Sequence, residues 1–282
     1  MNPRILRPQS LADACTLLSL DDDALIYGGG TALQILLKQG VLSASSFVDI
    51  SGIPGLNELR RAENEILVGS MVSIRRMETD PLVRQFLPLA SAAYAKVANP
   101  RVRNTATVGG NIAHGDYRLD PPVALLVLGA TIEVTSTEGS RSIPIEEFFV
   151  DFQLTALDHG EIVTSIKIPV STDIVASTYV KLSSLSANDW PSASAAAAIF
   201  QRPGEAKILR LALGALAPTP VVTSVDITGF REDQVAEAVL ERAILMMDPL
   251  PDVRGGIEYK RNLGRVAVED ALRNLWRDQP SD

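Results

Sequence analysis

The run Gly28-Gly29-Gly30 constrains the fold of this 282-residue chain more than any other feature. It separates an apolar segment at residues 25–27, which predicts a β-strand, from an apolar segment at residues 31–38, which predicts an α-helix that stops at Gly40. Glycines permit positive φ and carry no Cβ, so the backbone N–H groups of such a turn can converge on an anion. The start of a helix adds free N–H donors and the positive end of its dipole. The sequence therefore predicts a strand–turn–helix unit that suits a phosphate or pyrophosphate.

Two common phosphate-binding motifs do not fit this turn. No Gly-Lys-Ser or Gly-Lys-Thr follows the glycines, so the turn is not a Walker A loop. Leu33 occupies the third glycine position of the dinucleotide-binding fingerprint, so that motif is also excluded. A tight turn without a ligand is the alternative at this point, because a short glycine loop is a weak motif.

A second stretch of small residues, at positions 104–111, again contains two adjacent glycines. Its Thr107 and Asn111 can donate hydrogen bonds to phosphate or ribose oxygens. Asp120, nine residues beyond Asn111, could accept a bond from a ribose hydroxyl, cap the helix that two following prolines would open, or do both. Two such loops predict two walls around an extended cofactor that contains a pyrophosphate. Two unrelated turns are the alternative.

Composition excludes several functional classes. The formal net charge of −8 argues against a general nucleic-acid binder and against docking on an anionic membrane. Cys15 is the one cysteine and there are two histidines, so this chain alone cannot build a disulfide, a four-cysteine zinc site or an iron–sulfur cluster. No apolar run approaches the roughly 18 residues of a membrane span, and the N-terminus lacks a secretory core. We therefore expect a cytoplasmic protein with no membrane span.

Hydrophobic periodicity predicts an α+β chain with a boundary at residues 169–173. Ser10 predicts the cap of a first helix, and the alanine-rich stretch at residues 193–198 predicts a buried element. Further strands are expected at residues 47–50, 66–68, 131–136, 162–168, 177–182 and 209–213. Further helices are expected after Ser73 and at residues 88–97, 123–128 and 231–247, and a last helix would bury Tyr259, Leu263, Val266, Ala267, Ala271 and Leu275.

Longer segments resemble a known family. The segment VRNTATVGGNIAHGDYRLDPPVALLVLGATIEV, with YGGGTALQILLK upstream, resembles the FAD-binding medium subunit of molybdenum hydroxylases. This is the flavoprotein of the xanthine dehydrogenase and carbon monoxide dehydrogenase family. The resemblance continues in family order through EIVTSIKIP, YVKLSSLSANDWPSASAAAAI, LRLALGALAPTPV and VRGGIEYKRNLGRVAVEDAL, so it covers nearly the whole chain.

The resemblance implies an α+β fold in two parts. Residues 1–170 would form a two-subdomain FAD-binding domain of the PCMH (vanillyl-alcohol oxidase-like) type, with subdomains at about 1–55 and 56–170. Residues 171–282 would form a C-terminal α+β domain of the CO dehydrogenase flavoprotein type.

The resemblance also implies the cofactor-binding residues. The first glycine loop would hold the FAD pyrophosphate and the second would continue the cradle. The family aspartate at the adenosine end corresponds to Asp120, and Val97, Val163 and Lys181 fall near the flavin. An ordinary surface position is the alternative for Lys181. The flavin does the redox work, so no catalytic side chain and no metal ligand is expected. The implied FAD-binding residues are Ile26, Tyr27, Gly28, Gly29, Gly30, Thr31, Ala32, Leu33, Val97, Thr107, Val108, Gly109, Gly110, Asn111, Asp120, Val163 and Lys181.

The resemblance further implies a subunit that passes electrons from iron–sulfur clusters on a partner chain through non-covalent FAD to an external acceptor. The [2Fe-2S] clusters would lie on a small subunit and molybdopterin on a large subunit, in a dimer of heterotrimers. A free-standing FAD-dependent oxidoreductase of the same fold and a flavin-free scaffold subunit are the alternatives.

This sequence departs from the family pattern at one place. Ser183, Ser184 and Ser186 stand where the family often has basic residues before the position of Asp189, which argues against NAD as the acceptor. Trp190 beside it is expected to pack in the core. Basic residues around the last helix would form either a solvated face or the edge of a docking surface for a partner subunit: Arg254, Lys260, Arg261, Arg265, Arg273 and Arg277.

Overall fold

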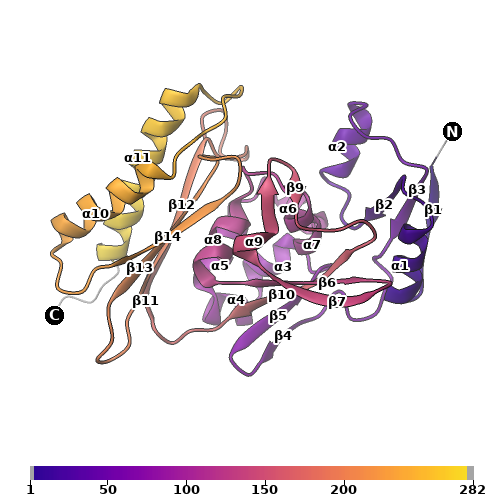
Figure 1. The fold of residues 1–282 in the computed structure, drawn as a ribbon, viewed down its shortest axis with the longest axis horizontal. Coiled ribbons are helices and arrows are strands. Elements are labelled where there is room, and N and C mark those ends of the chain that lie inside the picture. The colour runs from indigo at the N-terminus through magenta and orange to yellow at the C-terminus, as the bar shows by residue number, and fades with distance from the viewer. Residues whose placement is uncertain (1–2, 278–282) are drawn as a thin grey trace.

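The protein has an α+β fold in which three sheets follow one another along its long axis (Figure 1). The structure is a computed structural model, and it describes residues 3–277. A three-stranded parallel sheet lies at the N-terminal end, a five-stranded antiparallel sheet in the middle, and a four-stranded antiparallel sheet at the C-terminal end. The predicted α+β class is confirmed.

The N-terminal unit positions the first glycine loop. Ser10 caps its first helix as predicted, because its hydroxyl accepts a bond from the N–H of Asp13. The glycine turn follows the second strand directly. The helix after it begins at residue 33, two residues later than predicted. The elements are β1 (Arg4–Leu6), α1 (Leu11–Ser19), β2 (Ala24–Tyr27), α2 (Leu33–Lys38) and β3 (Ser46–Asp49), with strand order β1-β3-β2.

The middle unit holds the largest core, under one face of its sheet. The sheet has the order β4-β5-β10-β6-β7, formed by β4 (Leu59–Ala62), β5 (Glu65–Gly69), β10 (Ile162–Pro169), β6 (Thr131–Ser136) and β7 (Gly139–Pro144). A small hairpin consists of β8 (Phe149–Asp151) and β9 (Leu154–Thr155). The helices are α3 (Ile74–Thr79), α4 (Pro81–Phe86), α5 (Pro88–Ala95), α6 (Pro100–Thr105), α7 (Val108–Ala113), α8 (Asp120–Leu128) and α9 (Ile145–Phe148).

Two predictions for this unit were wrong. The second glycine stretch is largely helical, because Thr107 caps α7 and places Gly109 and Gly110 inside its first turn. Asp120 does not cap α8: Leu119 holds the cap position, and the Asp120 carboxylate turns toward other side chains instead. The end of α8 agrees with the prediction, since Gly129 adopts the left-handed conformation at φ 67°.

The C-terminal unit packs helices on the outer face of its sheet. The sheet has the order β11-β12-β13-β14, and α10 and α11 cover its outer face in the yellow and orange part of Figure 1. Helix α8 of the middle unit lies against the opposite face. The elements are β11 (Ile174–Leu182), β12 (Ala193–Phe200), β13 (Ile208–Gly214), β14 (Val221–Asp226), α10 (Glu232–Leu245) and α11 (Ile257–Arg277).

The alanine-rich stretch forms β12 and is buried, as predicted. Its side chains alternate between two cores. Ala196 and Ala198 pack in the core of the middle unit, whereas Ala195 and Ala197 pack in the core under α11. One strand therefore forms part of the wall of both cores.

The last helix buries a face slightly different from the predicted one. Ala267, Ala271 and Leu275 are buried as expected, but Tyr259 and Val266 are 48% and 44% exposed. None of the helices in residues 3–277 combines the length and the apolar composition that a membrane crossing requires.

Candidate cofactor-binding site

The two glycine-bearing segments lie against each other. A Cβ on Gly28 would lie 3.2 Å from the Thr107 hydroxyl oxygen. A Cβ on Gly29 would overlap the backbone carbonyl of Thr105. Gly29 is required because the two backbones approach so closely that no side chain fits between them, whereas Gly28 leaves space for the Thr107 side chain. The structure thus brings residues 26–33 and 107–111 together on one side of the molecule.

Free backbone donors line this junction. Among the described residues, the N–H groups of positions 29–33 donate no hydrogen bond. The turn is held by Gly30 at φ 68° and by the Tyr27 hydroxyl, which accepts a 2.7 Å bond from Gln34. A row of unpaired amide donors in a half-buried glycine turn is the chemistry that binds phosphate oxygens.

The second segment adds polar side chains to the junction. The Thr107 oxygen accepts a 3.2 Å bond from the N–H of Gly110, so its own proton is available for an acceptor. The Asn111 side chain carries a buried oxygen that has no partner among the described residues. Buried polar atoms normally have hydrogen-bond partners, so this orphaned acceptor fits a cofactor that brings a donor, such as a ribose hydroxyl, together with its phosphate oxygens. On these observations the residues present fit a pyrophosphate-containing dinucleotide.

Asp120 and Lys181 form a buried ion pair. The Lys181 ammonium lies 2.9 Å from a carboxylate oxygen of Asp120, and the two side chains are 4% and 2% exposed. The ammonium also donates a 2.8 Å bond to the carbonyl of Lys96, next to Val97. Burial raises the pKa of Asp120 to about 6, although the positive charge of Lys181 opposes that rise. Lys181 is therefore not an ordinary surface lysine.

Tyr179 belongs to this group and is absent from the predicted residues. Its hydroxyl donates a 2.6 Å bond to the second carboxylate oxygen of Asp120. Burial, together with the neighbouring Asp120 charge, raises the pKa of Tyr179, so it stays a donor. The signal was in the sequence, because residues two apart on a strand share a face and Tyr179 is two residues before Lys181.

The direct contact of Asp120 with Lys181 limits how a dinucleotide can lie. The sequence expectation put Asp120 at the adenosine end and Lys181 near the flavin, but the two side chains meet at 2.9 Å. Both can therefore contact only one part of an extended cofactor. Val163, expected in the same place, is 5% exposed on β10 and points into the core of the middle unit.

A groove of about 480 Å³ opens beside the ion pair. Pockets that bind small molecules usually span about 300–1,000 Å³, so the groove is large enough for a ring system. No acidic side chain lines it, and three hydroxyl groups do, including those of the serines that depart from the family pattern. The lining residues are Lys96, Lys181, Leu182, Ser183, Ser184, Ala187, Tyr259 and Leu263.

Other chemically reactive residues lie outside these groups. Cys15 is buried in α1, and its thiol contacts the carbonyl of Thr135. His114 follows α7, where burial lowers its pKa, so its imidazole is neutral near pH 7. Within residues 3–277, no group of three or more histidine, cysteine, aspartate or glutamate side chains is placed to hold a metal ion.

Solved structures define the class of protein. The fold superimposes with a TM-score of 0.92 on a chain of carbon monoxide dehydrogenase from Hydrogenophaga pseudoflava, at 28% sequence identity and over 99% of both chains. The molecule is an oxidoreductase subunit of this dehydrogenase type.

Sequence comparisons give the family. The model of the FAD binding domain in molybdopterin dehydrogenase matches residues 1–171. The chain is 29% identical to the carbon monoxide dehydrogenase medium chain of Hydrogenophaga pseudoflava over 95% of both chains. It is 32% identical to a putative xanthine dehydrogenase FAD-binding subunit of Escherichia coli K12, over 76% of this chain and 74% of that one. The chain belongs to the family of FAD-binding domains of molybdopterin dehydrogenases.

Proposed function

We propose that this chain is the FAD-binding subunit of a multi-subunit molybdenum hydroxylase, which passes electrons from iron–sulfur clusters on a partner chain to an external acceptor. One observation carries the proposal: a glycine turn whose N–H groups at positions 29–33 are free packs against the segment that carries Thr107 and the unpaired Asn111 oxygen. Bound FAD would supply the redox chemistry, so this chain has only to bind and orient it.

The residues of the chain would divide the work of binding. The N–H groups of positions 29–33 would hold the pyrophosphate, and Thr107 and Asn111 would complete its hydrogen bonds. The buried Asp120–Lys181 pair would hold one further part of the cofactor and keep a positive charge at a fixed position beside it. Residues 1–170 would form the FAD-binding domain and residues 171–282 the second domain.

The partners follow from what this chain lacks. One cysteine and two histidines cannot bind iron–sulfur clusters or a molybdenum centre. Similar proteins carry the names medium chain and subunit, which supports an assembly of different chains. We therefore assign the [2Fe-2S] clusters to a small subunit and molybdopterin to a large subunit, in a dimer of heterotrimers.

Titration of the flavin-free chain with FAD tests the proposal. We expect one FAD per chain, bound without a covalent bond, because the one cysteine, Cys15, is buried in α1, remote in sequence from both glycine segments. Acid precipitation of the loaded protein should release the flavin into the supernatant. A chain that takes up no FAD would overturn the proposed function, and flavin that stays with the precipitate would overturn only the non-covalent attachment.

A further inference from the structure

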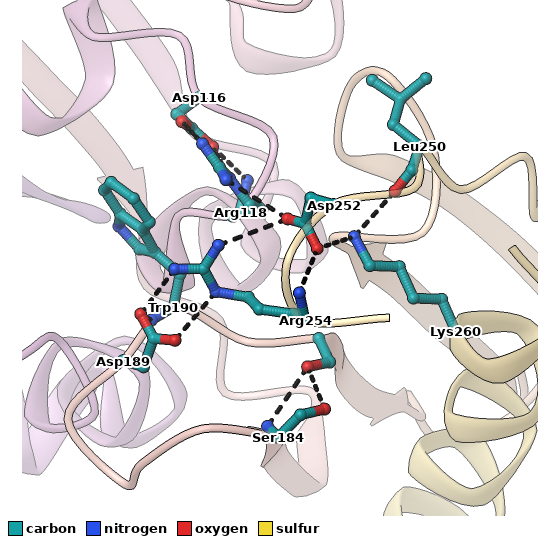
Figure 2. Close-up of polar contacts among 10 residues, drawn as sticks. Asp116, Arg118, Ser184, Asp189, Trp190, Leu250, Asp252, Arg254 and Lys260 are labelled. Carbon is teal, nitrogen blue, oxygen red and sulfur yellow. Dashed lines mark hydrogen bonds and ion pairs between the residues drawn. The ribbon is translucent and has the colours of Figure 1, made fainter. Parts of the chain in front are cut away.

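Six charged side chains form a closed cluster near Ser184, one of the residues that line the groove (Figure 2). Arg118 binds Asp116 through two parallel hydrogen bonds of 2.8 and 2.6 Å. Arg254 binds Asp189 in the same bidentate way, at 2.9 and 2.7 Å. The cluster comes from three separate parts of the chain: residues 116–118 between α7 and α8, residue 189 between β11 and β12, and residues 252–260 at the start of α11.

Asp252 joins these parts. One of its carboxylate oxygens accepts 3.3 Å bonds from both Arg118 and Arg254, and the other lies 2.9 Å from the Lys260 ammonium. Three aspartates face two arginines and one lysine, so the cluster is electrically neutral. Burial alone would raise the pKa of Asp252, but bonds from Lys260 and Arg254 outweigh it and lower that pKa.

The cluster is buried and organised around one aromatic ring. Asp116 and Lys260 are fully shielded from solvent, and Arg254 is 8% exposed at its side chain. The guanidinium groups of Arg118 and Arg254 lie 4.5 and 5.2 Å from the centre of the Trp190 ring. Arg254 and Lys260 were expected on a solvated face or a docking edge. That expectation was wrong, because both form ion pairs inside the protein.

Two of the three parts that the cluster joins border the groove, and the third, residues 116–118, leads to Asp120, whose partner Lys181 lines the groove. Arg118 lies two residues before Asp120, which begins the next helix, α8. Asp189 and Trp190 continue the segment whose Ser183 and Ser184 line one wall.

The opposite wall belongs to the helix that the cluster anchors. Tyr259 and Leu263 form it on the first turns of α11, and Lys260 lies between them in sequence. The Tyr259 and Ser184 hydroxyls meet across the groove at 3.2 Å. The Arg254–Asp189 pair and this hydroxyl contact both join the two walls, so the cluster contributes to their spacing.

We infer that Arg118 is a positioning residue for cofactor binding, which fixes the two walls of the groove relative to the Asp120–Lys181 pair. The inference rests on the proposed function and extends it to a residue outside the implied binding set. A buried, neutral ion-pair cluster contributes little net stability compared with apolar packing, but it specifies one geometry, because any displacement leaves a buried charge unpaired. Arg118 is the connecting member, since its fork binds Asp116 on its own segment and Asp252 on the α11 side.

The test separates positioning from stability. In Arg118→Met the cluster keeps three negative and two positive charges, so we expect a lower Tm and FAD binding weaker by about tenfold or more. In the double variant Arg118→Met/Asp116→Asn the cluster is neutral again, and the amide oxygen introduced at position 116 can still accept the bond from the backbone N–H of residue 118. We expect the Tm to recover while the Kd for FAD stays about tenfold weaker and the visible circular dichroism of the flavin stays altered. Arg118→Lys keeps the charge but loses the fork, so it should fold and bind FAD with an intermediate Kd.

The matched control is Arg141→Met, which removes another bidentate arginine, paired with the largely buried Glu161 carboxylate outside the cluster. Its Kd for FAD should stay within about twofold of the wild-type value. Recovery of wild-type Kd together with Tm in the double variant would overturn the inference, because the cluster would then act through stability alone. Unchanged Kd in Arg118→Lys and in the double variant would also overturn it and leave the proposed function intact. A wild-type chain that binds no FAD would overturn both.

Discussion

At Gly29 the space that a side chain would need is occupied by the backbone of another segment. The glycine triplet suggested that the backbone must approach a ligand closely, yet the position of a Gly29 Cβ is already filled by the Thr105 carbonyl. Gly109 is similar, since a Cβ there would overlap the side chain of Ser70. These glycines therefore assemble the cradle, and the free N–H groups next to them are a result of that assembly.

Gly29→Ala should consequently harm both folding and cofactor binding. The added methyl must push the two glycine segments apart, so we expect the free energy of unfolding to fall by about 2 kcal/mol and FAD binding to be lost. Gly110→Ala should have a smaller effect, because its Cβ would meet only the Thr107 hydroxyl at 3.0 Å. Urea unfolding and FAD titration measure both effects. Gly52→Ala is the control, since no atom lies within 4 Å of its Cβ position. Equal stability of Gly29→Ala and Gly52→Ala would contradict the packing argument.

Asp120 should make stability depend on pH in an unusual direction. Its pKa is raised from 3.8 to about 6, so the folded chain holds this proton more tightly than the unfolded chain does. Its contribution to stability is complete below about pH 4 and is lost as the pH rises through about 6. Relative to Asp120→Asn, the wild-type chain should lose up to about 3 kcal/mol between pH 4 and 7.

Comparison with the asparagine variant is needed because other aspartates act in the opposite direction. Hydrogen bonds from Arg118 and Arg254 lower the pKa values of Asp116 and Asp189 despite burial. The stability that these two aspartates contribute to the fold is therefore lost in acid. Those contributions are the same in both proteins and cancel in the difference. Urea unfolding of the two proteins at a series of pH values measures that difference. A difference that stays constant from pH 4 to 7 would show that Asp120 titrates normally.

At the scale of elements, the sequence predicted those features that depend on neighbouring residues. The Ser10 cap, the strand at 131–136 and the Gly129 terminus all follow from neighbouring residues, and all agree with the structure. Helix α7 was missed because two adjacent glycines disfavour a helix interior. What stabilises α7 is its contact with Ser70, whose carbonyl accepts a 2.8 Å bond from the Gly109 N–H. A contact between residues so far apart in the sequence has no local pattern.

The buried Lys260 side chain holds the start of α11 against the segment before it. Its ammonium is fully buried and donates to the Leu250 carbonyl at 2.8 Å as well as pairing with Asp252. Lys260→Met should lower the free energy of unfolding by about 3 kcal/mol, because it removes a fully buried ammonium and leaves the partly buried Asp252 carboxylate short of one partner. The neighbouring Arg261→Met is the control, since its pair with Glu258 is exposed and worth at most about 1 kcal/mol. Urea unfolding measures both losses. Similar losses in the two variants would show that the buried pair contributes no more to the free energy of unfolding than the exposed pair does.

At the scale of the whole molecule, composition predicted more than spacing could. One cysteine and two histidines were enough to predict that the metal centres lie on other chains. The meeting of Asp120 with Tyr179 and Lys181 was not predictable, because about 60 residues separate the partners and only the packing of the C-terminal sheet on α5 and α8 brings them together. The cluster around Trp190 was hidden for the same reason, since its members span residues 116–260.

The isolated chain should therefore be an incomplete catalyst. Loaded with FAD and free of iron and molybdenum, it should oxidise no purine, aldehyde or carbon monoxide, although small redox reagents should still react with its flavin. Purification of the native complex should bring down iron and molybdenum together with the FAD. Activity of the isolated chain comparable to that of the whole complex would favour the free-standing flavoenzyme instead.

Strand β12 couples the thermal unfolding of the middle and C-terminal units, because it belongs to the cores of both. Because Ala196 and Ala198 belong to one core while Ala195 and Ala197 belong to the other, neither side can open without exposing apolar surface of its neighbour. The chain should show a single cooperative heat-absorption peak in calorimetry, despite its three sheets. Two separated peaks would mean that the shared strand does not couple them. With such coupling, FAD bound at the two glycine-bearing segments would also raise the melting temperature of α10 and α11, which lie on the face of the C-terminal sheet opposite α8.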